Sequence, residues 1–338
     1  MNVSDIRTCI RHFLGIFLSI VVGHSVALEG FLFNFVGSES SFKCVFYMSA
    51  WLMLSTIPLL CFSRKKLGFD LENLINILVS SVGLGVAMVL SLSAYKFAPV
   101  ADAFTLYYSN AVFSLVLESF AFRVYPQKLH ILAIFLTLLG IITVSQPPFI
   151  FNHFQSDSAE SAESQNDTLV DTRFLGCVLA VAAAITTSVW MLFLRRIENL
   201  NITFITFLQA LVPVLGYNVF GAFASNKETF CIKGNLFAMS LLCINYCVNL
   251  PLLNLCLKLE PSYIVTSVRC IATVTSYVIQ VLRGEQTSWY TFMGASFIVA
   301  SVLIVSFTKW RDSVAIQTSI RTRRNSKTAE DFSFELMN

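Results

Sequence analysis

The sequence predicts an all-α integral membrane protein with ten transmembrane helices arranged as two inverted five-helix repeats. Hydrophobic residues make up 56% of the 338 residues, charged residues make up 13%, and the mean hydropathy is +0.70. Such a composition is typical of chains that lie mostly in hydrocarbon. Two stretches also resemble each other: Lys96-Phe97-Ala98-Pro99 and Lys258-Leu259-Glu260-Pro261 stand 162 residues apart (258 − 96), and each precedes two apolar runs separated by a short charged turn. A duplicated membrane unit is typical of secondary transporters.

Ten apolar runs are each long enough to cross a hydrocarbon core of about 30 Å as a helix that rises about 1.5 Å per residue. Helices are expected because extended backbone facing lipid would leave its polar groups unpaired. The expected spans are 12–34, 43–62, 73–95, 99–121, 127–146, 174–194, 202–224, 235–256, 261–282 and 288–308. The predicted domains are a first repeat (1–150), an acidic flexible linker (151–172), a second repeat (173–308) and a basic cytosolic tail (309–338).

The first span has two interpretations. Arg7 and Arg11, an apolar core and Ser25-Val26-Ala27 resemble a cleavable signal peptide. Small residues, however, recur at every fourth position in this span and again in the sixth, and such stripes let helices pack closely in lipid. The two stripes are Gly15, Ser19, Gly23 and Ala27, and Gly176, Ala180, Ala184 and Ser188. Either stripe alone is explained by helix packing, but their offset of 161 residues (176 − 15) favours a retained first helix of a repeat.

The orientation follows from the distribution of Lys and Arg between alternate connecting segments. One side holds 16 of them and the other side holds 6, which predicts that both termini are cytosolic. The sequon Asn166-Asp167-Thr168 lies in the longest connecting segment, on the predicted non-cytosolic side. Asn166 is therefore the expected glycosylation site.

Motifs of other function classes are missing from the sequence. The chain has no GxxxxGK loop, no GxGxxG after a strand, no HExxH and no GxSxG, and its nine cysteines show no metal-ligand spacing. The small net charge of +3 gives no support for nucleic-acid binding. The sequence thus predicts neither an enzyme nor a metal- or cofactor-dependent protein.

The runs AYKFAPVADAFTLYYSNAVFSLVLE (94–118) and GIITVSQPPFIF (140–151) resemble the drug/metabolite transporter superfamily of ten-helix proteins with two EamA-type repeats. Ala101-Asp102-Ala103 and Pro147-Pro148-Phe149 look closest to the G branch of solute carrier family 35. The resemblance covers all ten spans and is strongest over 94–151. It implies a solute carrier of the endoplasmic reticulum, another endomembrane or the plasma membrane, which works by alternating access with organic anions as candidate cargo.

Polar residues share one face of the ninth span, at helical spacing. They are Ser262, Thr266, Arg269, Thr273, Ser276 and Gln280. An arginine within a span costs about 2.5–3.5 kcal/mol on insertion scales, so Arg269 should face a cavity or a partner. One interpretation is that its guanidinium binds an anionic substrate through two parallel hydrogen bonds. The alternative is an internal ion pair with Asp102 or Glu29, or snorkelling to the interface.

Further candidates for the substrate site come from the fourth and eighth spans. Tyr107 stands 162 residues before Arg269, and Asn110 and Ser114 continue down the same helix; Asn245 belongs to an amide-rich stretch around Pro251. The expected substrate-binding residues are Arg269, Tyr107, Asn110, Thr266, Thr273, Gln280, Asn245 and Ser114. Each could instead make an interhelical hydrogen bond, typically worth about 0.6 kcal/mol.

Asp102 and Glu29 are candidates for coupling transport to protons, because a carboxylate inside a membrane is costly to keep charged. Both could simply lie at the water interface.

The predicted function is that of a multi-pass secondary transporter, which moves a small solute, an organic anion or metabolite, across a membrane by alternating access. The expected partners are this solute and the lipid bilayer; a homodimer or a membrane protein partner stays open. The alternative function is a non-transporting membrane scaffold or regulatory protein that binds a membrane partner. The discriminating feature is the polar face around Arg269, because a scaffold has no need to expose it to an open cavity.

Overall fold

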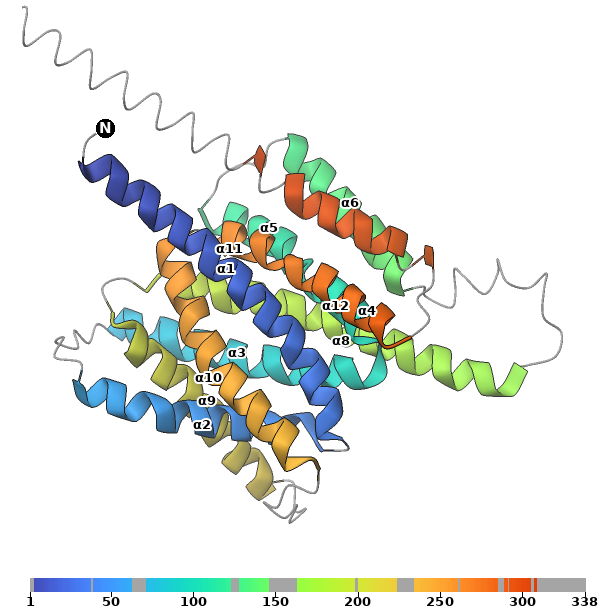
Figure 1. Ribbon diagram of the computed structural model, residues 1–338, viewed down its shortest axis with the longest axis horizontal. Helices are drawn as coiled ribbons and strands as arrows, with labels where there is room; N and C mark the ends of the chain where they lie inside the picture. The colour runs from blue at the N-terminus through green and yellow to red at the C-terminus, as the bar shows by residue number, and fades with distance from the viewer. Residues whose placement is uncertain are drawn as a thin grey trace, which may run out of the picture.

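The computed structural model describes residues 3–37, 39–62, 71–122, 128–145, 163–197, 200–223, 234–260, 262–284, 289–290, 292–304 and 307–308. These residues are helical apart from short turns and connections, and no strand occurs among them. The helices of the first half are α1 (Val3–Val36), α2 (Ser41–Phe62), α3 (Leu71–Phe97), α4 (Val100–Tyr107), α5 (Asn110–Phe122) and α6 (Lys128–Ser145). Those of the second half are α8 (Glu163–Arg195), α9 (Ile202–Phe223), α10 (Leu236–Leu259), α11 (Ser262–Arg269) and α12 (Ile271–Leu282), followed by an apolar helix over Phe292–Ile304 (Figure 1).

The predicted all-α membrane class is confirmed within these residues. Six helical segments are long and apolar enough to cross a membrane, and four shorter apolar helices accompany them. Each of the ten segments overlaps one of the ten predicted spans. The predicted tail 309–338 lies outside the described residues.

Two predicted spans are interrupted. The fourth is divided into α4 and α5 at Tyr108 and Ser109, and the ninth into α11 and α12 at Cys270. The interruptions are gentle turns, since Ser109 N–H bonds to the carbonyl of Leu106 and Thr273 N–H to that of Cys270, as in a 3₁₀ helix. The first residues of α4 and α11, Val100 and Ser262, are 162 residues apart (262 − 100), so the two divided helices are aligned with the sequence repeat.

The sixth helix begins earlier than expected. Residues 151–172 are predicted as a flexible linker, but α8 starts at Glu163 and continues to Arg195. No glycine or proline occurs between Glu163 and Leu175, so nothing in the backbone stops the helix from extending into this polar segment. Residues 151–162 of the predicted linker lie outside the described residues.

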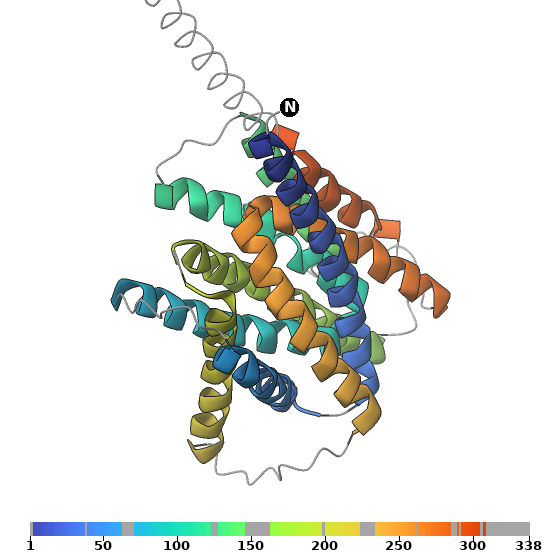
Figure 2. The same ribbon diagram turned by 60° about the vertical axis from the view of Figure 1, so that its left-hand side comes forward.

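When each helix of one half is exchanged with its equivalent in the other half, the main contacts between helices stay the same. The contact of α3 with α8 matches that of α10 with α1, and the contact of α3 with α9 matches that of α10 with α2. Likewise α4 and α5 contact α8 as α11 and α12 contact α1, while α4 contacts α12 and α5 contacts α11. The divided helices therefore cross near their interruptions, inside the bundle (Figures 1 and 2).

The small-residue stripes lie at close helix crossings, as predicted. A Cβ added to Gly15 in α1 would meet Leu259 and Glu260, and one added to Gly176 in α8 would meet the equivalent Phe97 and Ala98. Gly23 of α1 faces the backbone of Arg269 in the same manner, with a Cβ-to-Cα distance of 3.3 Å. The glycines thus allow α1 and α8 to approach the helices that carry the polar face.

Two equivalent lysines tie the helix ends to loops. Lys96 at the end of α3 donates a hydrogen bond to the carbonyl of Glu39, and Lys258 at the end of α10 donates one to the carbonyl of Leu200. The first contact belongs to a larger group, because the Glu39 carboxylate also pairs with Lys43 at 3.2 Å and accepts a hydrogen bond from Gly234 N–H.

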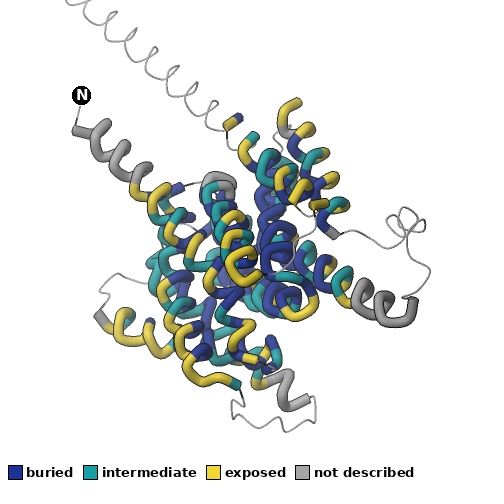
Figure 3. Tube along the Cα trace, turned by 45° about the vertical axis from the view of Figure 1, so that its right-hand side comes forward, coloured by how far each residue is buried: buried dark blue, intermediate teal, exposed yellow. Residues whose placement is uncertain are grey.

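Burial is distributed as expected for a protein in lipid. Large apolar side chains such as Phe17, Trp51, Ile75 and Phe135 are about half exposed on the outer faces, and Figure 3 shows the buried residues gathered at the centre of the bundle. Many buried side chains are polar. Since lipid tails hide the apolar exterior, polar groups concentrate where helices meet.

The helix α6 and the helix Phe292–Ile304 pack against each other (Figures 1 and 2). Gly140 and Gly294 face each other at their crossing, and Thr137 Oγ1 donates to Ser301 Oγ at 2.7 Å. The remaining helices hold the polar interior described next.

Candidate functional site

A group of polar and aromatic side chains, the central cluster, lies where α11 ends and α4 ends. It contains Glu29 of α1, Tyr95 of α3, Tyr107 and Tyr108 at the end of α4, Asn249 of α10 and Arg269 of α11. Five helices therefore contribute side chains to this cluster, either from the end of the helix or from its middle. The cluster brings together one cation, one carboxylate, one amide and three phenols.

Arg269 is the most unusual member of the central cluster. Its side chain is 2% exposed, its Nε and Nη1 atoms have no hydrogen-bond partner among the described residues, and no carboxylate of that part of the chain lies within ion-pair distance. The guanidinium lies 5.9 Å from the ring centroid of Tyr108, a cation–π contact. A buried donor left unpaired typically costs about 1–3 kcal/mol, so these N–H groups have the capacity to donate hydrogen bonds to a further group.

Glu29 faces the same interior from α1. Its side chain is buried, its carboxylate interacts with the side-chain amide of Asn249, and it interacts electrostatically with Arg269 without forming a direct ion pair. Two opposite charges are thus held near each other but apart. Snorkelling of Arg269 to the interface, one of the alternatives, does not agree with its burial.

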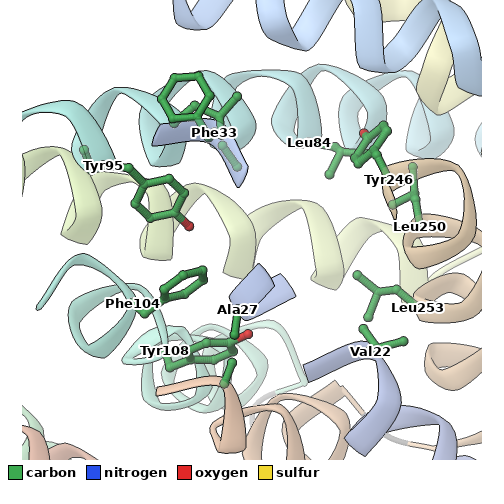
Figure 4. Close-up of a cluster of buried hydrophobic side chains, with 14 of the residues drawn as sticks. Val22, Ala27, Phe33, Leu84, Tyr95, Phe104, Tyr108, Tyr246, Leu250 and Leu253 are labelled. Carbon is green, nitrogen blue, oxygen red and sulfur yellow. The ribbon is translucent and has the colours of Figure 1, made fainter. Parts of the chain in front are cut away.

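Aromatic rings form the wall beside the two charges. The ring centroids of Tyr95 and Phe104 are 5.1 Å apart, and those of Phe104 and Tyr108 are 6.1 Å apart (Figure 4). Those of Tyr107 and Tyr108 are 5.4 Å apart. Tyr107 accepts a hydrogen bond from Thr187 of α8 at 3.3 Å, whereas the hydroxyl of Tyr108 has no partner among the described residues. Such rings can stack on a planar substrate and offer hydroxyl groups to it.

The candidates on α5 are buried and not engaged through their side chains. Neither side-chain atom of Asn110 has a hydrogen-bond partner in the described part of the chain, and the same holds for Ser114 Oγ. The carbonyl of Asn110 accepts a hydrogen bond from Ser188 at 2.9 Å. Asn110 therefore starts α5 next to α8 with a free amide, in the first turn after the interruption.

The polar face of the ninth span is buried along its whole length, so it faces the interior of the bundle. Ser262, Thr266, Arg269, Thr273, Ser276 and Gln280 are all at most 2% exposed. The hydroxyls of Thr266 and Ser276 donate to carbonyls one turn back in their own helices, and Gln280 Oε1 has no partner among the described residues. The division at Cys270 leaves the face continuous.

Asn245 is engaged between helices. Its amide oxygen accepts a hydrogen bond from Ser25 Oγ at 2.6 Å, and its amide nitrogen donates to the carbonyl of Ser25 at 3.0 Å. Asn254, further along α10, donates to Thr206 and Gln209 of α9. Of these asparagines around Pro251, Asn245 and Asn254 thus bond to other helices, and Asn249 belongs to the central cluster.

Asp102 is not the partner of Arg269, contrary to one alternative from the sequence. It forms an ion pair with Arg173 of α8 at 2.9 Å, with side-chain exposures of 3% and 30%. Tyr277 of α12 lies beside this pair and its hydroxyl is 3.2 Å from Thr105 Oγ1. Asp102 lies in the first turn of α4, which packs against α12, whereas Arg269 lies at the end of α11. The crossing of the helices therefore keeps the two side chains apart.

Sequence reasoning missed Tyr95, Tyr108 and Trp190. Trp190 of α8 is buried against Gly83 and its indole N–H has no partner among the described residues. Aromatic residues in an apolar run carry no periodic signal that separates an inward position from a lipid-facing one. The predicted site at Asn166 lies in the first turns of α8, and its side chain lies outside the described ones.

Comparisons with known proteins agree with the expected family. The chain is 24% identical over 286 residues to human solute carrier family 35 member G1, which covers 81% of this chain and 72% of that protein. A protein of known crystal structure superposes with a TM-score of 0.56 at 14% identity, over 89% of this chain and 98% of the other; this likeness concerns the fold alone. No protein-family model matches the chain. With its apolar helices, the chain is thus similar to a member of solute carrier family 35, the family that its sequence resembles.

Proposed function

We propose that this protein is a secondary transporter that moves a small organic anion across a membrane by alternating access, with Arg269 as the residue that binds the anionic group. The solute carrier relative points to a membrane transporter of small solutes rather than an enzyme. The observation that carries the proposal is the guanidinium of Arg269, buried in the middle of the bundle with two unpaired nitrogens.

The symmetric packing supports ten membrane crossings in two inverted repeats. Exchanging the first four helical segments of one half with those of the other reproduces the main contacts between helices, including the reciprocal contacts of α4 with α12 and of α5 with α11. Such a pseudo-twofold arrangement gives two conformations of similar energy, which open the same central site to opposite sides.

The divided helices support a site at their crossing. In transporters, interrupted helices bring backbone termini and polar side chains to the middle of the membrane, where a substrate compensates them. Here Arg269, Tyr108 and Asn110 all lie within two residues of an interruption and are buried with unpaired side-chain atoms. We therefore assign the anionic group to Arg269 and the uncharged part of the substrate to Tyr107, Tyr108 and Asn110.

Transport by the purified full chain in liposomes tests the assignment. The probes are labelled benzoate, benzenesulfonate and succinate, with benzamide as the uncharged analogue. We expect uptake of at least one anion above that of protein-free liposomes and above that of benzamide. Arg269→Lys keeps the charge but loses the planar arrangement of donors, so transport should weaken while the preference for anions survives; Arg269→Gln should lose both.

The control separates transport from folding. Arg196→Gln is a suitable matched variant because Arg196 is exposed, outside the central cluster and after the end of α8; its transport should equal that of the unaltered protein. Anion transport that is unchanged in Arg269→Gln would contradict the assignment. No transport of any probe by well-folded protein would favour the scaffold function.

The orientation is proposed from the charge distribution. Asn166 should be the sequon that receives a glycan, because its segment is expected on the non-cytosolic side. In cells, the electrophoretic mobility shift removed by a glycosidase should vanish in Asn166→Gln and persist in Asn201→Gln. The reverse result would invert the proposed topology.

A further inference from the structure

We infer that Glu29 is the proton-binding residue of the transport site and that one proton is taken up with each monovalent anion that binds. This inference rests on the proposed function. It assigns the coupling ion, for which the sequence left Asp102 and Glu29 as candidates.

The structure separates three of the buried carboxylates, those of Glu29, Glu39 and Asp102, by their partners. Asp102 pairs with Arg173 at 2.9 Å, and Glu39 pairs with Lys43 at 3.2 Å, both near helix ends. Glu29 lies within α1, and no cation of the described residues is within ion-pair distance of it. A carboxylate that is already paired with a cation has little reason to exchange a proton during transport. Glu29 has an amide for a neighbour and a cation at a longer distance.

Charge balance gives the direction of coupling. With Glu29 ionised, the charges of Glu29 and Arg269 cancel, and a bound anion would bring an uncompensated negative charge into a low-dielectric interior. With Glu29 protonated, the central cluster carries the single positive charge of Arg269, and a monovalent anion neutralises it. The anion and the proton therefore favour each other's binding, and the loaded site is neutral for passage across the membrane.

The groups that face Glu29 agree with this role. They are Arg269 at the end of α11, Tyr108 after the end of α4, Tyr95 of α3, and Tyr246 and Asn249 of α10. Arg269 is the one charged group among them. The phenols and the amide are neutral and can accept or donate a hydrogen bond as the carboxyl group gains or loses its proton.

A proton suits this place better than a metal cation. A bound sodium ion needs several oxygen ligands, and it would stand next to the positive guanidinium of Arg269. No group of three or more His, Cys, Asp or Glu side chains that could hold a metal ion occurs in the described part of the chain. A proton needs one basic oxygen and adds no ion beside the arginine.

The test measures proton uptake on binding, with benzenesulfonate as the probe because its own charge does not change near neutral pH. Purified full-length protein in weakly buffered detergent solution is mixed with the probe, and a pH indicator records the protons taken up. We expect about one proton for each probe bound at alkaline pH, and an affinity that falls about tenfold per pH unit above the midpoint. In liposomes, an inward proton gradient should accelerate uptake.

Two variants of Glu29 keep the test independent of folding. Glu29→Gln, which has nearly the same shape, should bind the probe without proton uptake and with a flat pH profile. Glu29→Asp should keep the coupling with a displaced midpoint. The matched control is the double variant Asp102→Asn with Arg173→Gln, which removes another buried carboxylate together with its partner and should keep the coupling of the unaltered protein.

The outcomes distinguish this inference from the proposed function. Binding of benzenesulfonate that depends on Arg269 but takes up no proton, or proton uptake that persists in Glu29→Gln, would overturn the inference and leave anion transport intact. Failure to bind or transport any anion in an Arg269-dependent way would overturn both.

Discussion

The two divided helices have the same geometry and different chemistry. Helices α4–α5 and α11–α12 start 162 residues apart, break at equivalent places and cross each other. At the first interruption stand Tyr107, Tyr108 and Asn110; at the equivalent positions of the second stand Arg269, Cys270 and Ala272. The shared backbone brings both interruptions to the same interior, and the differences in side chains make one side aromatic and amidic and the other cationic.

This difference shows how a scaffold with two similar halves can form a site with one cationic side and one aromatic side. A symmetric pair of arginines would place two like charges close together, at a high electrostatic cost. One arginine opposite an aromatic wall instead gives a single charge with a stacking surface, which suits an anion that has a planar or apolar remainder. The following predictions test the comparison, from the largest expected effect to the smallest.

Moving the charge between the two interruptions is expected to have the largest effect. Arg269→Tyr should reduce benzenesulfonate transport by about 10- to 100-fold, since a charge-assisted hydrogen bond contributes about 1.5–3 kcal/mol. Adding Tyr107→Arg to this variant should restore part of the transport, because residue 107 faces the same interior. Uptake into liposomes measures both, and Tyr107→Arg alone shows the cost of a second cation. No recovery in a well-folded double variant would mean that the two positions are not exchangeable.

The ion pair at the start of α4 has no equivalent in the second half, where Ile264 replaces Asp102. Arg173→Gln leaves the carboxylate of Asp102, 3% exposed, without its cation, and should lower the free energy of unfolding by about 2–3 kcal/mol. The double variant with Asp102→Asn should recover most of the loss. Thermal unfolding in detergent measures the difference; a double variant as unstable as the single one would contradict the pairing.

Equivalent glycines of the two stripes should differ in their tolerance of a methyl group. A Cβ at Gly176 would lie 2.7 Å from the backbone nitrogen of Ala98, whereas one at Gly15 would lie 2.7 Å from Cγ of Glu260, a flexible side chain. Gly176→Ala should therefore cost about 1–3 kcal/mol and Gly15→Ala clearly less. Gly216→Ala, with open space around the site, is the control. Equal melting temperatures for the first two variants would argue against the crossing geometry.

The two equivalent lysines should show the smallest difference. Lys96 binds a carbonyl and also lies 5.5 Å from the ring centroid of Phe33, while Lys258 binds a carbonyl at an exposed helix end. Lys96→Met should cost about 1 kcal/mol and Lys258→Met about half of that. Denaturation of both variants in the same detergent resolves them, and a larger effect at Lys258 would reverse the comparison.

Much of the fold follows from the sequence, since hydropathy alone locates each apolar segment. The positions of the two helix interruptions do not follow from the sequence. Tyr108, Ser109 and Cys270 are neither glycine nor proline, so no local signal marks them; the crossing of packed helices determines where the chain turns. Pro251 shows the converse, because a proline often ends a helix, yet α10 continues through this residue.

The candidate site was partly predictable for a physical reason. Charged residues in apolar runs are costly, so Arg269 and Glu29 stand out in the sequence. The sequence does not show which charged residues pair with each other. It cannot tell that Asp102 pairs with Arg173 and that Arg269 therefore has no direct ion pair among the described residues. Tyr95 and Tyr108 are equally hidden, since a phenol costs little in either environment.

The exchange of contacts between the two halves has a consequence for biosynthesis. The most extensive helix pairings, α3 with α8, α1 with α10 and α2 with α9, join segments made early to segments made late. While the ribosome is still producing α8 to α12, the newly inserted first half lacks these partners, and Glu29 has neither Asn249 nor Arg269 beside it. The nascent first half must therefore wait in the bilayer with polar groups uncovered. Mutations that slow the arrival of α10 and α11 should accordingly expose the chain to membrane quality control before any defect of the mature protein could be measured.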